Sequence, residues 1–167
     1  MRIIGIDPGY AIVGFGIVDY DAGKFRVLDY GAITTDKDTP FPKRLCEIYD
    51  DFCQILDNWK PDALSIERLY FTNNQKTGID VAQARGLIIM AAAQRSIEIN
   101  EYTPLQVKQA VVGYGQAVKK QVQEMTKNIL KLPAVPKPDD TADALAMTIC
   151  HGQTSGSLLR NLRTSNI

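Results

Sequence analysis

Four carboxylates are the residues of this chain best suited to chemistry, because each lies near the start or the end of a predicted strand or helix. The first, Asp7, follows the apolar run Arg2–Ile6 and precedes the turn sequence Pro8-Gly9. An ionised aspartate at the end of an apolar strand needs a cation or a hydrogen-bond donor, since burying it unpaired costs free energy. We therefore interpret Asp7 as part of a site, against the alternative that it serves only the turn.

The other acids come much later in the chain. Glu67 lies near the end of Ala63–Leu69, a short run typical of a strand returning to a sheet. Asp140 and Asp143 share one face of a predicted helix, because residues three apart are neighbours on a helix surface. Asp139 and Asp143 share a face as well, so the spacing does not choose between Asp139 and Asp140.

A cluster of these acids would bind divalent metal ions. Carboxylates within a few ångströms of one another repel, so they require a cation between them. Ligands that offer only oxygen atoms favour Mg²⁺ or Mn²⁺ over zinc. Two such ions about 4 Å apart activate water and stabilise the leaving oxygen in displacement at phosphorus. The predicted chemistry is that of a nuclease.

Hydrophobic periodicity predicts the elements that position these acids. Strand-like runs lie on both sides of Pro8-Gly9, and three antiparallel strands precede strands that alternate with helices. This order predicts an α/β fold with a mixed five-stranded sheet flanked by helices. The later strands are expected at 24–34, 63–69 and 97–102, and helices at 40–59, 79–96, 104–112 and 139–151, with a further helix carrying Lys119, Lys120 and Lys127.

Length and composition indicate one compact domain. The 167 residues are 45% hydrophobic, and 19 basic residues balance 19 acidic ones. We expect a domain at 1–152 and a polar tail at 153–167, with the sole histidine, His151, favourably placed at the negative end of the last helix. The three cysteines fit no zinc motif, and no apolar run approaches the roughly 18 residues of a membrane helix. We therefore expect a cytoplasmic protein with free thiols and no membrane association.

The formal net charge of zero gives no general case for an anionic partner, so a nucleic-acid surface would have to come from local clusters of residues. Two regions of the sequence are candidates. The aromatic pair Tyr70-Phe71 precedes a polar loop that carries Lys76. Lys108, Lys119 and Lys120 lie on two helices that flank a glycine-rich turn. Taken alone, the loop is about equally typical of nucleic-acid contact and of an ordinary solvated loop, whereas the lysines are more typical of a solvated helix face.

Five short segments in order give the chain a family resemblance. They are Gly5-Ile-Asp-Pro-Gly9, Ile66-Glu67, Gln83-Ala-Arg-Gly86, Gln106-Val-Lys-Gln109 with Val111-Val-Gly113, and Asp140-Thr-Ala-Asp-Ala-Leu-Ala146. Over about residues 2–151 this order resembles the bacterial RuvC family of Holliday-junction resolvases.

The resemblance implies a ribonuclease-H-like fold and metal-dependent cutting of four-way DNA junctions. Asp7, Glu67, Asp140 and Asp143 match the family's catalytic and metal-binding acids, which favours Asp140 over Asp139. Two Mg²⁺ ions per site are expected, and Mn²⁺ is expected to substitute. Symmetric nicks in two strands would leave 5′-phosphate and 3′-hydroxyl ends.

The resemblance also assigns a DNA-binding surface. Tyr70 matches an aromatic position that stacks on a base, and the neighbouring Phe71 could take that role instead. Lys108 and Lys119 match basic positions, which favours phosphate contact over a solvated face. The remaining predicted DNA contacts are Lys76, Arg85 and Lys120.

A stripe of small residues in the helix predicted at 79–96, with one residue just before it, suggests close packing on the sheet or on a second subunit. Gly78, Ala82 and Gly86 fall four residues apart. The resemblance implies that this region forms a homodimer, and that a branch-migration helicase complex of the RuvA and RuvB type is a further partner.

Two other functions compete with junction cutting. Asp7-Pro-Gly, with Gly14 and Gly16, also resembles the first phosphate loop of actin-like kinases and ATPases, but those proteins need two such domains. A non-catalytic junction binder would use the acids only to hold a structural ion or to cap a helix.

Overall fold

The computed structural model describes the backbone of residues 1–69 and 75–164, and the side chains of residues 1–69 and 78–156. The predicted order of strands and helices is confirmed. The elements are β1 (Arg2–Asp7), β2 (Ile12–Asp21), β3 (Lys24–Thr34), α1 (Phe41–Trp59), β4 (Ala63–Glu67), α2 (Gln75–Gln94), β5 (Glu98–Tyr102), α3 (Pro104–Val112), α4 (Lys119–Ile129) and α5 (Asp139–Thr164).

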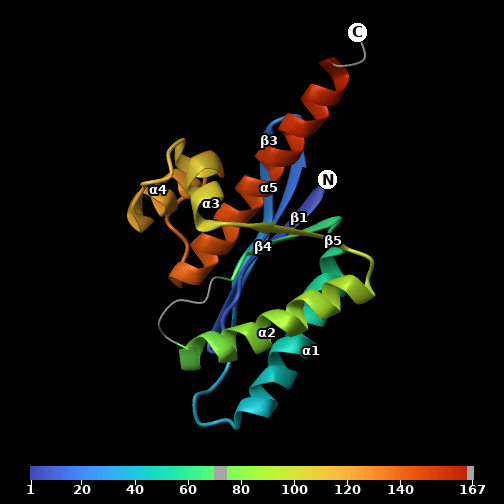
Figure 1. Ribbon diagram of the computed structural model, residues 1–167, viewed down its shortest axis with the longest axis vertical. Helices are drawn as coiled ribbons and strands as arrows, with labels where there is room; N and C mark the ends of the chain where they lie inside the picture. Colours follow the sequence, from blue (N-terminus) through green and yellow to red (C-terminus); the bar gives the residue numbers. More distant parts are fainter. Residues whose placement is uncertain (70–74, 165–167) are drawn as a thin grey trace.

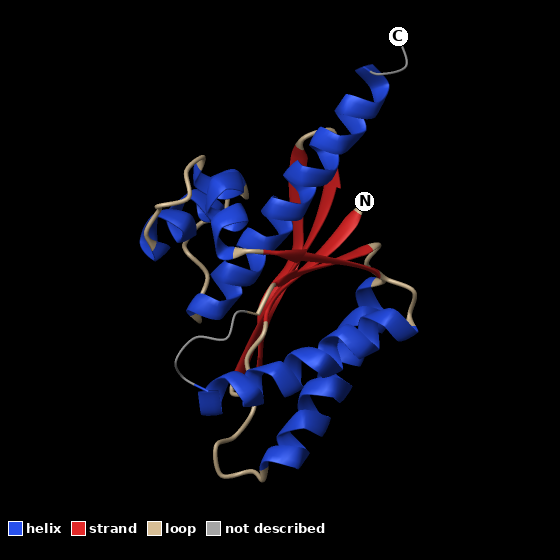
Figure 2. Cartoon of the chain, viewed as in Figure 1, coloured by secondary structure: helices blue, strands red, loops and turns tan. Residues whose placement is uncertain are grey.

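The strands form one mixed sheet in the order β3-β2-β1-β4-β5 (Figure 2). β1, β2 and β3 pair antiparallel, whereas β4 runs parallel to β1 and β5 runs parallel to β4. Parallel neighbours require a crossover, which α2 supplies between β4 and β5. As a result, β1, β4 and β5 end at the same edge of the sheet.

The helices α1 and α2 cover one face of this sheet (Figure 1). Side chains alternate between the two faces of a strand, so Ile4 and Ile6 of β1 point together toward these helices. Both are fully buried, as are Phe52 of α1 and Ile88 of α2 in the same cluster. This cluster fixes the register in which β1 lies.

The other face is covered by α5, with α3 and α4 beside it (Figure 1). Two glycines allow α5 to approach the sheet closely. A Cβ atom on Gly5 would lie 2.1 Å from the carbonyl oxygen of Ala144, and one on Gly14 would lie 2.0 Å from that of Asp140. Glycine is therefore required at both positions, and the helix axis is held against β1 and β2.

The last helix is longer than the sequence predicts. Its expected end at His151-Gly152 is wrong, because α5 continues to Thr164. Gly152 does not stop the helix: a Cβ there would lie 2.5 Å from the Phe25 ring, so the glycine allows close packing inside the helix. The division into a domain at 1–152 and a tail at 153–167 stays a prediction.

His151 also differs from its predicted role at a helix end. The side chain is 4% exposed, and its Nδ1 atom lies 2.8 Å from the Tyr102 hydroxyl in a hydrogen bond. Burial lowers the pKa of His151, so the ring is held neutral. The side chain thus connects α5 to Tyr102 of β5, and it does not lie at the end of the helix, where it would interact with the helix dipole.

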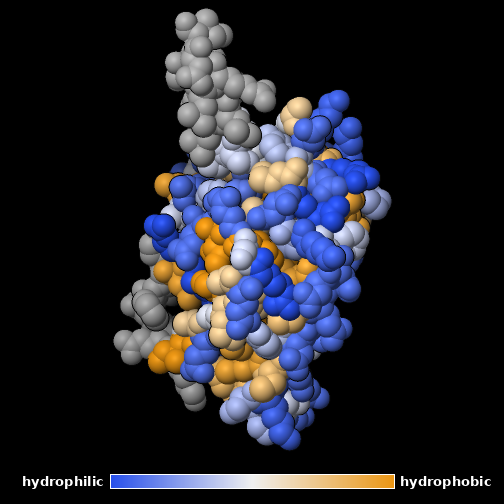
Figure 3. Space-filling model, turned by 90° about the vertical axis from the view of Figure 1, so that its right-hand side faces the viewer, coloured by the Kyte–Doolittle hydropathy of each residue, from blue (hydrophilic) through white to orange (hydrophobic). Residues whose placement is uncertain are grey.

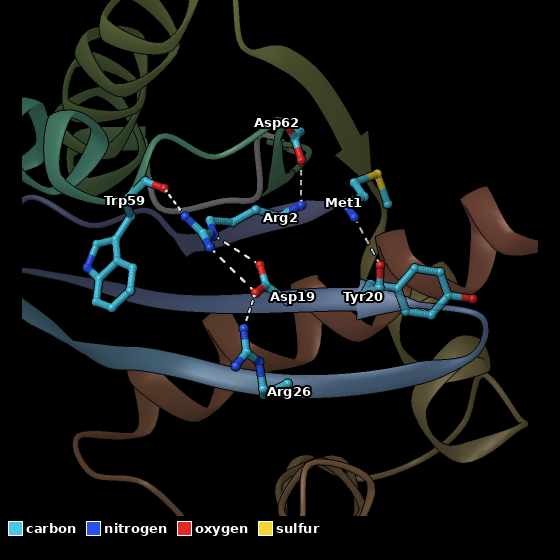
Figure 4. A network of polar contacts seen from close by, with 7 residues as sticks. All are labelled: Met1, Arg2, Asp19, Tyr20, Arg26, Trp59 and Asp62. Carbon is cyan, nitrogen blue, oxygen red and sulfur yellow. Dashed lines mark hydrogen bonds and ion pairs between the residues drawn. The ribbon is translucent and has the colours of Figure 1, made fainter.

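The opposite end of the sheet carries a network of paired charges (Figure 4). Asp19 accepts hydrogen bonds from Arg2 at 3.0 Å and from Arg26 at 2.7 Å. Arg2 also donates to the carbonyl oxygen of Trp59 at 2.7 Å, which ties β1 to the end of α1. These charges neutralise one another, so a cavity of about 790 Å³ that they line is a weak candidate for the site.

Cys46, Cys53 and Cys150 are free thiols, as expected. Within the described part of the chain, no helix has the length and hydropathy that a membrane crossing requires.

Candidate active site

Asp7 and Glu67 lie side by side because each is the last residue of its strand. β1 and β4 are parallel neighbours whose register pairs Ile6 with Ile66. The next residue along each strand is therefore an acid, about 4.8 Å from its counterpart across the pair. Both side chains point to the face covered by α5, because side-chain direction alternates along a strand.

Asp140 and Asp143 reach the same place from the first turns of α5. Gly14 is paired with Asp7 across β1 and β2, and the backbone of Asp140 lies directly over Gly14. The close contact that these glycines permit thus places the start of α5 beside Asp7. Four carboxylates from three distant parts of the sequence thus meet at the carboxyl edge of the sheet.

Burial and the neighbouring carboxylates together raise the pKa of Asp7. Burial is the largest cause of a rise from 3.8 to about 7, followed by repulsion from Asp143, Glu67 and Asp140. Burial and the charge of Asp143 also raise the pKa of Glu67. These carboxylates therefore resist full ionisation unless a cation lies beside them.

Lys119, in the first turn of α4, supplies one positive charge. Its Nζ atom lies 2.8 Å from Oδ2 of Asp143 and 3.8 Å from Oδ2 of Asp139. The hydrogen bond to Asp143 is the largest cause of a raised pKa for Lys119, and the ammonium group in turn offsets part of the rise in the pKa values of Asp7 and Glu67. The single positive charge of this ammonium group neutralises only part of the negative charge of the converging carboxylates.

The donor set fits a divalent cation, although the side chains do not stand in a ready-made coordination geometry. Over residues 1–69 and 78–156, no three Asp, Glu, His or Cys side chains form a group arranged to hold a metal ion. The fit rests on the chemistry of the donors, which are carboxylate oxygens gathered at one place, and on the pKa of Asp7, which burial and then the neighbouring carboxylates raise. Hard divalent cations favour such oxygen ligands.

A cavity of about 220 Å³ adjoins the acids. Glu67 and Asp143 line it together with Lys108 and Lys119, and apolar side chains of α3, α4 and α5 complete the wall. The predicted basic residues Lys108 and Lys119 thus lie beside the acids, while Lys120 follows Lys119 in the first turn of α4.

Arg85 holds the edge of the site in place. Its Nε atom donates to the carbonyl oxygen of Glu67 at 3.1 Å, and its Nη2 atom donates to Glu101 at 2.7 Å. This arrangement fixes the end of β4 against β5. The role of Glu101 was not predicted, because no local pattern links it to an arginine on a different element. The predicted DNA contact of Arg85 stays a prediction.

Other predicted site residues lie away from the acids or outside the description. Tyr70 and Phe71 fall outside the described residues, as does the side chain of Lys76. Gly78 and Gly86 lie on α2, and nothing in the described chain stands within 4 Å of a Cβ built on either glycine. The small-residue stripe is therefore not packed against the sheet.

Gly14 and Gly16 have a packing role that the phosphate-loop interpretation did not include. Gly14 lies against the backbone of Asp140, and a Cβ on Gly16 would meet the side chain of Leu145 at 2.6 Å. The glycines that suggested a kinase-like loop are thus accounted for by the packing of α5 on the sheet.

Together, the mixed sheet and its flanking helices define an α/β protein with a ribonuclease-H-like fold that carries carboxylates at its strand ends. Thermus thermophilus RuvC in complex with a Holliday junction substrate superposes with a TM-score of 0.88 and 32% identity, over 94% of this chain and 96% of that chain. The yeast mitochondrial Holliday junction resolvase Ydc2 shares the fold at a TM-score of 0.66 and 13% identity, over 99% of this chain and 84% of that chain.

The sequence identifies the family within this class. Residues 3–151 match the family model for crossover junction endodeoxyribonuclease RuvC. Crossover junction endodeoxyribonuclease RuvC of Ruminiclostridium cellulolyticum is 55% identical over 98% of this chain and 99% of its own length. That of Fusobacterium nucleatum is 51% identical over 100% of this chain and 88% of its own length. The chain belongs to the RuvC family, and the predicted family and fold class are confirmed.

Proposed function

We propose that this chain resolves four-way DNA junctions by hydrolysing one phosphodiester bond in each of two strands. The observation that carries the proposal is the convergence of Asp7, Glu67, Asp140 and Asp143 beside a cavity lined by lysines. Family membership supplies the substrate, since relatives are named for cutting crossover junctions.

The four acids would hold Mg²⁺, or Mn²⁺ in its place, with two ions per site. Such ions would supply an activated water molecule and stabilisation of the leaving oxygen, and the products would carry a 5′-phosphate and a 3′-hydroxyl. Asp7 and Glu67 are fixed by their strands, and Asp140 and Asp143 by α5, so the ligands are held by rigid elements. This is the kind of preorganisation that an in-line displacement requires.

The lysines around the acids would orient the scissile strand. Lys108 and Lys119 line the cavity beside Glu67, where their ammonium groups would meet phosphate oxygens. A phosphate that bound Lys119 would compete with Asp143 for its ammonium group. Lys120, Lys76, Tyr70, Phe71 and Arg85 remain proposed further contacts to the junction.

We further propose that two copies of the chain form a homodimer through α2. The helix presents Ala82 and Gly86 on an outward face that also carries Ile79 and Met90, which are 54% and 43% exposed. Apolar surface lies among polar residues on the lower half of the molecule, where α1 and α2 lie (Figure 3). A two-fold axis would then direct two identical sites to two strands of one junction.

The dimer would act in the cytoplasm with a branch-migration helicase complex of the RuvA and RuvB type. A motor that moves the junction would bring successive sequences to the two active sites. This part of the proposal rests on family membership.

Cutting of a labelled synthetic junction by the Asp7→Asn variant tests the metal mechanism. The substitution removes a charged ligand but no phosphate contact, so we expect cutting in Mg²⁺ to fall at least about 1,000-fold while junction binding in EDTA is retained. A linear duplex of the same sequence should be cut poorly by the wild type.

Asp139→Asn is the matched control. Asp139 neighbours the proposed ligands but is paired with Lys137 and Lys119 on the surface. This variant should cut the junction within a few-fold of the wild-type rate. Normal cutting by Asp7→Asn would exclude the metal role, and binding without any wild-type cutting would favour the non-catalytic binder.

A further inference from the structure

An aromatic side chain on the turn between α3 and α4 is held in a fixed position and left open on the surface. Tyr114 is 45% exposed, and its hydroxyl donates to Oε1 of Gln121 at 2.9 Å. The same oxygen accepts the backbone N–H of Val118 at 3.0 Å. The start of α4 therefore anchors the hydroxyl end of the tyrosine side chain.

The backbone of this turn supports the same arrangement. Gly113 ends α3 with a φ of 91°, a conformation that side chains other than glycine rarely adopt. Gly115 lies against Leu105, whose side chain would be only 2.1 Å from a Cβ on that glycine. Leu105 and Val118 are 60% and 61% exposed, so the ring of Tyr114 belongs to an exposed apolar region.

The lysines near Tyr114 indicate which kind of ligand this exposed apolar region could bind. The first turn of α4 carries Lys119 and Lys120 and no acidic residue, although a helix N-terminus already favours anions. Lys108 of α3 lies across the same cavity from α4. Concentrated positive charge beside an exposed aromatic ring is typical of a surface that binds unpaired nucleic acid.

The region is also continuous with the acids. Within the first turn of α4, Lys119 reaches Asp143 while Gln121 holds Tyr114. On the α3 side, Pro104 lines the cavity next to Glu67, and the following residue, Leu105, packs on the turn. A strand whose phosphate meets Lys119 would thus bring a neighbouring base toward the tyrosine ring.

We propose that Tyr114 is a stacking platform for an unpaired base of the bound strand, next to the phosphate that is cut. Stacking accepts any base but requires that the base be free of its own stack, so the platform favours a branched junction over a continuous duplex. The inference rests on the proposed junction cutting, and it adds a residue that contributes to substrate selectivity.

The test compares Tyr114→Ala and Tyr114→Phe for binding to a four-way junction and to a linear duplex in EDTA. We expect the alanine variant to bind the junction about tenfold more weakly and the duplex within about twofold of wild type. The phenylalanine variant keeps the ring and loses only the hydroxyl, so it should retain most of the junction affinity. Met125→Ala, which shortens an exposed side chain on α4, is the control.

A fluorescent base reports on stacking directly. Junctions that carry 2-aminopurine at successive positions around the crossover should show quenching at one position with wild type and Tyr114→Phe, and not with Tyr114→Ala. Unchanged junction binding by Tyr114→Ala, equal losses on junction and duplex, or quenching that persists in Tyr114→Ala would each overturn the proposal. Wild-type protein that fails to cut the junction would instead overturn the proposed function.

Discussion

Asp7 shows why the chemistry of this site belongs to a group of residues and not to one of them. Its pKa reaches about 7 because burial and three other carboxylates all oppose its ionisation. The sequence indicated that an acid at the end of an apolar strand belongs to a site. It did not indicate the size of the shift, which depends on acids that are distant in the chain and meet Asp7 only after folding.

The raised pKa of Asp7 predicts how the stability of the metal-free protein depends on pH. Between pH 3.8 and about 7 the unfolded chain has released this proton while the folded chain still holds it. Rising pH therefore favours the unfolded state across this window, by up to ~4 kcal/mol if the whole shift is expressed. Below the window Asp7 is protonated in both states, so its contribution vanishes.

Urea denaturation in EDTA at pH 4 and pH 8 measures this effect. Asp7→Asn lacks the titrating group, so it should be more stable than wild type at pH 8 and lose most of that advantage at pH 4. Asp139→Asn, at an exposed acid whose pKa is lowered by Lys137, should show no such gain. Equal pH profiles for wild type and Asp7→Asn would contradict the buried, repelled carboxylate.

At the scale of elements, the site depends on how closely α5 approaches the sheet. Periodicity and turn residues predicted all five strands, the order of the helices and the start of α5 near Asp139. They failed at Gly152, because a glycine in a sequence can end a helix or allow close packing, and only the position of Phe25 distinguishes the two. The packing role of Gly14 was missed for the same reason.

Gly14→Ala tests whether this close approach positions the acids. The added methyl group would meet the backbone of Asp140, which cannot rotate away, so α5 must shift. We expect a loss of about 1–3 kcal/mol in the free energy of unfolding. We also expect slower junction cutting under conditions in which all of the protein is folded, because the acids are displaced. Denaturation and cutting rates below the unfolding transition measure the two effects.

Gly16→Ala provides a comparison on the same strand and the same face. Its added methyl group would meet the side chain of Leu145, which has rotamers available to it. This variant should lose less cutting activity than Gly14→Ala. Equal activity of Gly14→Ala and wild type would show that the acids tolerate a displaced α5.

At the scale of the whole molecule, one chain supplies one set of acids, whereas a junction has two strands to cut. The outward face of α2 offers small and apolar residues that nothing in the described chain covers, including Gly86 and the partly exposed Met90. The spacing of the small residues left open whether they pack on the sheet or on a second subunit, and the family resemblance implied the second subunit. Because the stripe is exposed in the single chain, we favour packing against a second copy of the chain and not against the sheet.

Gly86→Arg is predicted to separate the proposed dimer. A long charged side chain would project from the helix into open space in the single chain, so the fold should persist, whereas close helix contact between two copies would be blocked. Sedimentation should show a monomer for this variant and a dimer for wild type. Asn58→Arg, at an exposed position of α1, should remain dimeric. A dimeric Gly86→Arg variant would place the interface elsewhere.

DNA binding by a chain with zero formal charge must come from the local concentration of its lysines. Each phosphate neutralised by a lysine adds about 0.9 to the steepness of log affinity against log salt. Lys108→Gln and Lys120→Gln should therefore each reduce that slope by about 1 for a four-way junction in EDTA. Lys127 is paired with Glu124 in the same helix as Lys120, so Lys127→Gln should leave the slope unchanged. A shallow slope for wild type, or equal slopes for all three variants, would contradict a binding surface formed by α3 and the first turn of α4.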